Sequence, residues 1–217
     1  MPGMGNDVVD LKDPENIGKS RDERFIGRVF TAGERERIAS APSPDTLLWS
    51  LWAAKEAAYK AVSRADPAVC SIPHRYRVVL DAEDVTRKIV HLAGKVITPR
   101  GELVLEVAVA ADWVHALAAG AEETLNRLCR RVQRLEGGKG AADPSAFVRG
   151  ALLREIARRL DCPVGDLSVV KNQDGPGAPR VLFRGNLLAA EVSLSHDGRF
   201  AAFAFDPATL IPADCPG

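Results

Sequence analysis

The segment LWSLWAAKEAAYKAV, residues 48–62, predicts the helix around which the rest of this chain is organised. Its leucine, tryptophan, tyrosine and alanine side chains form a packing face at helical spacing, while Lys55, Glu56 and Lys60 carry charge. Glu56 and Lys60 are spaced i,i+4 and are therefore neighbours on the helix surface. Such a pair usually lies on a solvated face, where it contributes only about 0.2–0.5 kcal/mol. The helix pattern alone therefore favours ordinary surface charge, and a functional role needs support from other segments.

The composition indicates a globular protein without a strong overall charge. The chain has 217 residues, 46% of them hydrophobic, which is enough for one large domain or two small ones. Lys plus Arg and Asp plus Glu both number 29, so no net field attracts nucleic acid or an acidic membrane, and we expect neither as a partner. No signal-peptide pattern or bilayer-length apolar run occurs, and we expect a cytoplasmic protein. The cysteines are widely spaced, which gives no support to a zinc site or a disulfide framework.

The first segments of the chain predict a strand followed by two helices. GNDVVDL, residues 5–11, has the β-propensity of a short strand. Asp7 is unfavourable in an apolar strand unless it lies at the exposed end of the sheet or holds a cation, and for one aspartate alone the exposed end is the better interpretation. Farther along, Phe25 and Val29 are spaced as on a helix, and Thr31 with Glu34 forms a capping box that begins a second helix.

The remaining segments predict an α+β fold in two halves. Residues 70–120 alternate apolar and polar side chains and indicate an antiparallel meander of three or four strands. Residues 122–135 are interpreted as a basic amphipathic helix, and the Gly-rich residues 137–144 as a linker. The second half then predicts a helix over 147–160, strands over 167–171 and 180–183, and a strand pair over 191–205. The expected division is a first subdomain over 1–121, a basic helix and linker over 122–146, a second subdomain over 147–206, and a disordered tail over 207–217.

An internal repeat supports this division. EVAVAADWVHALAAG, residues 106–120, aligns without a gap with EVSLSHDGRFAAFAF, residues 191–205. The preceding helices also align, WAAKEAAYK over 52–60 with ALLREIARR over 151–159. We therefore predict a pseudodimer of two similar subdomains, each an antiparallel sheet with a long helix packed on it.

The two copies differ in their polar residues. Ser193, Ser195 and His196 in the second copy correspond to alanines in the first. A single histidine at a strand end is more often structural, but here it follows a serine and precedes Asp197-Gly198, a junction that suits anion binding. Asp7 and Glu56 supply two hard oxygen ligands of the kind that Mg²⁺ prefers. If the halves face each other, all these groups can share one cleft, which suggests a phosphorylated or nucleotide-like substrate.

Four segments together resemble the 4'-phosphopantetheinyl transferase superfamily: GNDVVDL, RFIGRVFTAGE, WAAKEAAYK and VSLSHDGRFAAFAF. The short members of this superfamily are trimers of one unit, whereas longer members fuse two units into a pseudodimer. The present chain is similar to the fused type, with the two units in reversed order. The resemblance implies a magnesium-dependent transfer of 4'-phosphopantetheine from coenzyme A to a serine of an apo carrier protein, which releases 3',5'-ADP. Fused units imply a monomer.

The resemblance also implies residue roles. Asp7 and Glu56 match the magnesium ligands, Lys60 matches the lysine that stabilises phosphate charge, and Ser195 and His196 match the groups that bind the 3'-phosphate of coenzyme A. Either Glu56 or a water on the metal would accept the serine proton. Lys55 is assigned a weaker role in contacting phosphate.

Two departures from the family pattern leave other interpretations open. Val9 stands where many fused members have a third acidic ligand, and Ala178 replaces a phosphate-binding lysine. Nearby Arg180 and the segment with Arg127, Arg130 and Arg131 are candidate substitutes, although these arginines equally fit a solvated helix face or a docking face for an acidic carrier. An alternative function is a catalytically reduced relative that binds coenzyme A or a carrier protein. A nucleic-acid binder using the basic helix is the weakest alternative.

Overall fold

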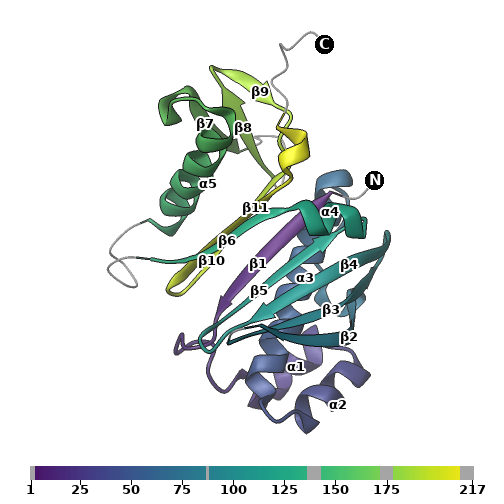
Figure 1. The fold of residues 1–217 in the computed structure, drawn as a ribbon. Coiled ribbons are helices and arrows are strands. Elements are labelled where there is room, and N and C mark those ends of the chain that lie inside the picture. Colours follow the sequence, from purple (N-terminus) through teal and green to yellow (C-terminus); the bar gives the residue numbers. More distant parts are fainter. Residues whose placement is uncertain (1–2, 87, 136–142, 172–177, 211–217) are drawn as a thin grey trace.

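The computed structural model describes residues 3–86, 88–135, 143–171 and 178–210. Figure 1 shows two sheet-bearing units of an α+β fold, joined along β1 of the first unit and β10 of the second. This arrangement confirms the predicted fold class. No helix among the described residues combines the length and apolar character needed to cross a bilayer.

The first unit is built on a five-stranded antiparallel sheet in the order β1-β5-β4-β3-β2. The predicted meander is therefore four strands, and the predicted N-terminal strand joins it at the edge. The helix α3 crosses one face of this sheet, and α1 and α2 lie at the end where α3 begins (Figure 1). The elements of the unit are β1 (Met4–Asp10), α1 (Glu23–Val29), α2 (Ala32–Ser40), α3 (Pro44–Ala65), β2 (Arg77–Thr86), β3 (Ile89–Thr98), β4 (Gly101–Val109) and β5 (Trp113–Ala119), with short 3-10 turns η1 (Lys19–Arg21) and η2 (Pro73–Arg75).

The close contact between α3 and β1 depends on small residues. Ala53, Ala57 and Ala61 are fully buried in the face that α3 turns to the sheet. A Cβ atom at Gly5 would lie 2.1 Å from the carbonyl oxygen of Ala57, so only glycine permits this approach. Because β1 is pressed against α3, Asp7 and the polar residues of the helix lie near one another.

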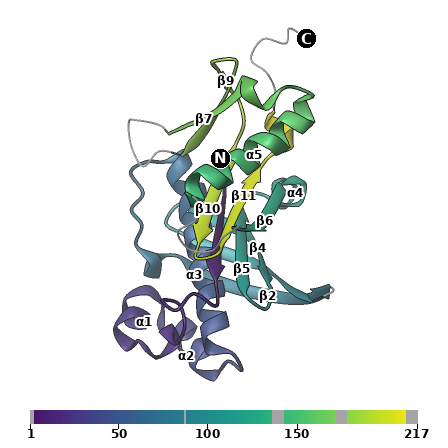
Figure 2. The same ribbon diagram turned by 90° about the vertical axis from the view of Figure 1, so that its left-hand side faces the viewer.

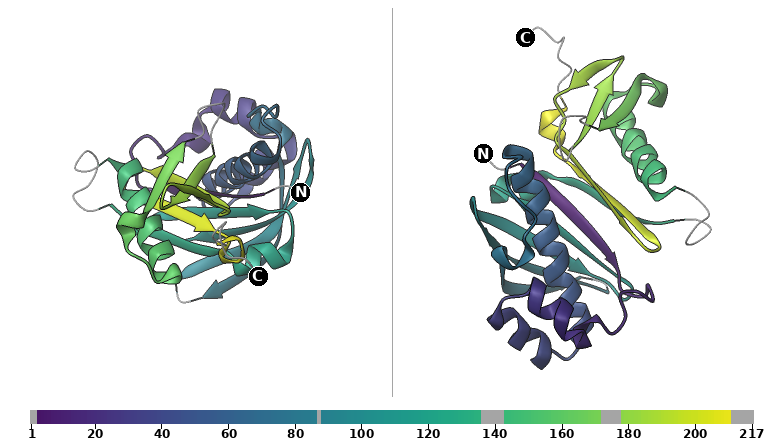
Figure 3. Two further views of the ribbon diagram at one scale, coloured as in Figure 1. Left: turned by 90° about the horizontal axis from the view of Figure 1, so that it is seen from above. Right: turned by 180° about the vertical axis from the view of Figure 1, so that it is seen from behind.

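The second unit contains two three-stranded antiparallel sheets and one long helix. The first of these sheets has the order β10-β11-β6, and the second has the order β7-β8-β9. The helix α5 packs on β10 and β11 (Figure 3). The elements are α4 (Glu122–Arg127), β6 (Cys129–Arg134), α5 (Pro144–Leu160), η3 (Val164–Asp166), β7 (Leu167–Lys171), β8 (Pro179–Phe183), β9 (Asn186–Leu188), β10 (Val192–Asp197), β11 (Phe200–Phe205) and η4 (Pro207–Thr209).

Most predicted elements are present, but the prediction of one basic helix over 122–135 is wrong. The helix ends at Arg127, and Cys129–Arg134 forms strand β6 on the edge of β11. Arginine is compatible with a helix, but the backbone groups of Phe200–Phe205 need partners on this side, and β6 supplies them. Strand β9 was also not predicted. The linker and the tail fall largely outside the described residues, although the first residues of the tail form η4.

Side chains, in place of a backbone ladder, join β1 to β10. The backbone N–H of Asn6 donates to Ser193 Oγ at 3.0 Å, and Asn6 Nδ2 donates to Ser195 Oγ at 3.1 Å. Figure 2 shows these strands seen from the side, with β1 next to β10. Val8 of β1 also packs against Phe200 and Ala202 of β11. Both polar and apolar contacts therefore fix the two units against each other.

Candidate functional site

A pocket of about 190 Å³ lies where the two units meet. Asp7 on β1 and Glu56 on α3 line it from the first unit, and His196 and Asp197 at the end of β10 line it from the second. Val8, Val9, Asn16, Trp49 and Trp52 complete the lining. The structure thus brings together the carboxylate pair and the histidine that the sequence predicted would share a cleft.

The two carboxylates are held in an environment that disfavours negative charge. Burial raises the pKa of Asp7, although the ammonium of Lys60 partly offsets this effect. Burial also raises the pKa of Glu56, and the negative charge of Asp7 raises it further. Lys60 Nζ lies 2.8 Å from Asp7 Oδ1 and 3.0 Å from the carbonyl oxygen of Asn6. A positive charge in the pocket would relieve the repulsion that Lys60 leaves uncompensated.

This donor set fits a magnesium ion that keeps several waters. Two carboxylates facing one pocket match the few protein ligands that Mg²⁺ commonly takes when substrate phosphates supply others. Among the described residues, no group of three His, Cys, Asp or Glu side chains is placed to hold a metal ion. Asp7 and Glu56, which both line the pocket, would be the direct protein ligands, and their assignment stays a prediction.

The structure gives Lys55 a different place from the predicted one. Its side chain is 1% exposed, and Nζ donates to Glu34 Oε2 at 2.8 Å and to the carbonyl oxygens of Pro73 and Tyr76. Lys55 follows the buried face of α3, whereas Glu56, the next residue, turns towards the pocket. Lys55 is therefore a buried ion-pair partner that cannot contact phosphate, and its predicted role in binding coenzyme A is corrected.

Ser195 also differs from its predicted role. Its hydroxyl is buried and accepts a hydrogen bond from Asn6, as Ser193 does from the backbone of Asn6. In a strand, successive side chains point to opposite sides. Ser195 therefore helps to join the two units, while its neighbour His196 lines the pocket. Only His196 of this pair is placed to contact a ligand there.

The arginines of residues 127–131 are occupied by carboxylates elsewhere. Arg127 pairs with Asp206, Arg130 pairs with Glu106, and Arg131 pairs with Glu155. None of these arginines lines the interunit pocket or the larger cleft described below. The prediction that Arg130 and Arg131 bind coenzyme A is therefore not supported by their positions.

Glu155 of the second unit lies in a different electrostatic environment from that of Glu56. It aligns with Glu56 in the internal repeat, but it accepts from Arg158 at 2.7 Å and from Arg159 at 3.0 Å, in addition to its pair with Arg131. The hydrogen bond from Arg158 is the main reason that the pKa of Glu155 is lowered. Several arginines thus surround this glutamate, whereas Lys60 only partly compensates the charges of Asp7 and Glu56.

A larger cleft adjoins the pocket through Lys60. It has a volume of about 710 Å³ and lies between the C-terminal part of α3 and the strands β8, β9 and β10. Lys60, Arg64 and Arg180 place positive charge along it, and Glu191 adds one carboxylate. Tyr59 and Leu187 add apolar surface. Because the ammonium of Lys60 also bonds to Asp7, this residue connects the cleft with the carboxylate pair.

Sequence reasoning missed several residues around the pocket. Asn16 lines it and donates from Nδ2 to Asp197 Oδ2 at 2.8 Å, while its carbonyl oxygen accepts from Trp49 Nε1 at 2.9 Å. Asp197 was noted only as part of a turn. Its position next to His196 could have predicted that Asp197 lines the pocket. Asn16 lies in a loop without a motif, so no sequence feature predicted its place there.

A buried histidine lies beside the interface between the units. His115 on β5 is 4% exposed, and its Nε2 lies 3.2 Å from Asn6 Nδ2. Burial, with smaller contributions from Arg130 and Lys60, lowers the pKa of His115 to about 3. The imidazole is therefore neutral in the folded protein near pH 7.

We expect His115 to make the protein less stable in mild acid. Between the unfolded pKa of roughly 6.5 and the folded pKa of about 3, the unfolded state binds more protons, so stability falls as the pH falls through this window. The expected slope from this group is about 1 kcal/mol per pH unit. Denaturant unfolding between pH 4 and pH 7 measures it. His115→Gln should flatten the profile, whereas the same change at exposed His74 should not, and equal slopes in all three proteins would contradict the assignment.

A family model of the 4'-phosphopantetheinyl transferase superfamily matches residues 3–118, more than half of the chain. The chain belongs to this superfamily. The matched segment is the first unit, which contains Asp7, Glu56 and Lys60. The second unit, which contributes His196 and Asp197 to the pocket, lies beyond the match.

Curated relatives of this superfamily member carry the name holo-[acyl-carrier-protein] synthase. The protein from Bartonella tribocorum is 40% identical over 60 residues, which cover 28% of this chain and 45% of the relative. The protein from Nitrobacter hamburgensis is 23% identical over 129 residues, which cover 54% of this chain and 89% of the relative. The protein from Jannaschia is 37% identical over 60 residues, covering 28% and 40%. Two of these three matches thus span less than half of the relative's length.

Proposed function

We propose that this protein transfers the 4'-phosphopantetheine group of coenzyme A to a serine hydroxyl of an apo carrier protein, with Mg²⁺, and releases 3',5'-ADP. Membership of the superfamily and the names of the relatives support the reaction class. The observation that carries the proposal for this chain is the shared pocket, in which Asp7 and Glu56 face His196 of the other unit beside Lys60.

The larger cleft is the proposed binding site for coenzyme A. Its volume of about 710 Å³ lies in the range of small-molecule sites, and its lining has three cationic side chains, one carboxylate and apolar surface. A nucleotide with several phosphates needs such cations, and Lys60 and Arg180 provide them from the two units. Arg180 would take the place of the missing lysine at Ala178. The diphosphate would then lie near Lys60, where the cleft meets the pocket.

The proposed step is a phosphoryl transfer to an alcohol. The serine oxygen of the carrier forms a bond to the phosphorus that bears the pantetheine arm, the bond from this phosphorus to the bridging oxygen breaks, and that oxygen leaves with 3',5'-ADP. Lys60 would stabilise the charge that grows on the phosphoryl oxygens. Mg²⁺ held by Asp7 and Glu56 would supply further positive charge there. Glu56, whose pKa is raised by burial, or a water would take the serine proton.

The fused architecture supports a monomer as the active form. Both halves of the pocket come from one chain, so the site does not need a second copy.

The substrates imply that the protein acts in the cytoplasm. Whether exposed Arg131 contributes to docking of an acidic carrier stays a prediction.

The test is a mass-shift assay on purified apo carriers. The protein is incubated with Mg²⁺, coenzyme A and a panel of apo carrier proteins from fatty-acid, polyketide and peptide synthesis. We expect one carrier to gain the mass of a single phosphopantetheine group and 3',5'-ADP to accumulate in equal amount. If coenzyme A binds but no carrier gains mass, the chain instead functions as a binding module, and the proposed reaction is wrong.

Replacing Arg180 with alanine should weaken the binding of coenzyme A. Loss of one cation from the cleft is expected to raise KM for coenzyme A about tenfold, equivalent to roughly 1.4 kcal/mol, because charge-assisted contacts to phosphate are lost. The KM for the carrier should not change. Arg184→Ala, which removes an exposed arginine paired with Asp166 outside the cleft, is the matched control. Equal KM values for both variants would show that Arg180 does not contact coenzyme A.

A further inference from the structure

The carboxylate of Asp10 is buried under the turn that joins β10 to β11. Its side chain is 1% exposed, and it accepts three hydrogen bonds from Arg199: from the backbone N at 2.9 Å, from Nε at 2.7 Å and from Nη2 at 2.6 Å. Burial alone would raise the pKa of Asp10, but these bonds and one from the backbone N–H of Lys12 hold it below its usual range. The aspartate is therefore ionised and fully paired across the interface between the units.

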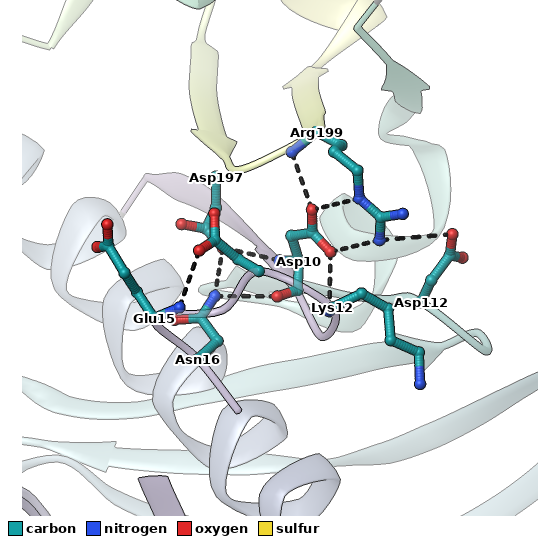
Figure 4. Close-up of polar contacts among 8 residues, drawn as sticks. Asp10, Lys12, Glu15, Asn16, Asp112, Asp197 and Arg199 are labelled. Carbon is teal, nitrogen blue, oxygen red and sulfur yellow. Dashed lines mark hydrogen bonds and ion pairs between the residues drawn. The ribbon is translucent and has the colours of Figure 1, made fainter. Parts of the chain in front are cut away.

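A second aspartate makes the reciprocal contact. Asp197 Oδ2, on β10, accepts from the backbone N–H of Asp10 at 2.8 Å and from Asn16 Nδ2 at 2.8 Å. Figure 4 shows Asp10 and Asp197 near each other, with the Arg199 side chain extending past Asp10 towards Asp112. Asp112 Oδ2 lies 3.7 Å from Nη2 of Arg199. Each unit thus holds the backbone of the other through an aspartate side chain.

Gly198 allows the two units to approach this closely. Its φ is +49°, and a Cβ atom at this position would lie 2.6 Å from Asp10 Oδ2. Both the backbone conformation and the contact with Asp10 therefore require glycine. We use the name interunit latch for the group of contacting residues Asp10, Asp197, Gly198 and Arg199.

The latch is continuous with the pocket. Asp197 lines the pocket next to His196, and Asn16, which bonds to Asp197, also accepts from Trp49 of the pocket wall. On the first unit, Asp10 lies at the end of the strand that carries Asp7. The position of His196 relative to Asp7 therefore depends on how the turn is held against β1.

We propose that Arg199 is a positioning residue, which through the interunit latch holds His196 and Asp197 opposite Asp7 and Glu56. Without the bidentate pair, the turn would be held to the end of β1 only by the contact of Asp10 with the backbone N–H of Arg199 and that of Asp197 with the backbone N–H of Asp10. The contacts of Asn6 with Ser193 and Ser195 would still join the two units farther along β1. The two units would then remain associated, but the pocket would be incorrectly assembled. The consequence for turnover rests on the proposed function, whereas the structural consequence does not.

Hydrogen exchange at three amides tests the structural part directly. The N–H groups of Asp10 and Arg199 donate to side chains within the latch, and that of Asn6, four residues before Asp10 on β1, donates to Ser193. In Arg199→Met we expect faster exchange at Asp10 and at residue 199, by at least about tenfold, with exchange at Asn6 unchanged. Arg199→Lys keeps the positive charge but lacks the paired N–H donors of the guanidinium group. Its exchange rates at these two amides should therefore lie between those of Arg199→Met and the wild type. Arg184→Met is the matched control.

The catalytic part is measured on the same proteins. Misplacement of His196 should lower kcat/KM for coenzyme A by about 10- to 100-fold in Arg199→Met, with partial recovery in Arg199→Lys and an unchanged KM for the carrier. Faster exchange at all three amides in Arg199→Met would overturn the proposal, because Arg199 would then stabilise the whole fold. A wild-type kcat/KM in a variant with fast exchange at the latch amides would also overturn it. If the wild type modifies no carrier, the proposed function fails, and the exchange pattern still decides whether the latch holds the turn.

Discussion

Replacing Glu56 with glutamine is expected to lower the rate of carrier modification by at least about a hundredfold without lowering thermal stability. The rate should fall because glutamine removes one of the two negative charges proposed to hold Mg²⁺ and one candidate proton acceptor. The stability should be maintained because burial and the charge of Asp7 already raise the pKa of Glu56, so its charge destabilises the metal-free fold. The mass-shift rate and the melting temperature without metal measure the two effects.

The control for this variant is Glu36→Gln, which makes the same chemical change on the exposed surface of α2. Its rate should equal that of the wild type. A Glu56→Gln protein that modifies the carrier within threefold of the wild-type rate would remove Glu56 from the site. A large loss of melting temperature would contradict the inference that its charge is uncompensated.

Replacing Lys55 with methionine is expected to lower the free energy of unfolding by about 3–5 kcal/mol, because the charge of Glu34 would be left buried without its partner. Glu34 also accepts from the backbone N–H of Val78 and from that of Thr31, so it links α2 to the start of β2 and to the buried face of α3. Chemical denaturation at pH 7 measures the loss. The double variant Lys55→Met with Glu34→Gln should recover part of it, since no charge then remains buried.

Lys95→Met provides the comparison for a surface pair. Lys95 and Glu102 form an exposed ion pair, for which the expected change is below about 1 kcal/mol. If Lys55→Met cost no more than this control, the inference that the buried pair stabilises the fold would be wrong.

The parts of the fold that could be predicted are those encoded by local periodicity. The alanine-rich segment around Ala57 indicated a helix, and the alternation in residues 70–120 indicated an antiparallel meander, because each pattern depends only on which face of one element is buried. The internal repeat predicted a common cleft for Asp7, Glu56 and His196 on the condition that the two units face each other, and the structure brings the three residues together in one pocket. Membership of the superfamily followed from the same segments.

Predictions failed where long-range pairing decided the structure. Arg130 and Arg131 occur in a segment compatible with a helix, but they lie in β6 because the edge of β11 is available to it. Lys55 and Glu56 are adjacent in sequence, yet one is buried against α2 and the other faces the pocket, because both sides of α3 are covered. Charge alone cannot distinguish the two residues.

The sequence by itself determined the α+β pseudodimer, the superfamily and the candidate carboxylate pair, because these depend on residue patterns within single elements and on their repetition. The tertiary structure alone decided that Ser195 joins the two units, that Lys55 stabilises the core, and that Asp10 and Arg199, 189 residues apart, hold the pocket together. Such contacts bring together side chains from distant segments. They depend on the exact packing of one unit against the other, for which no single segment carries a recognisable pattern.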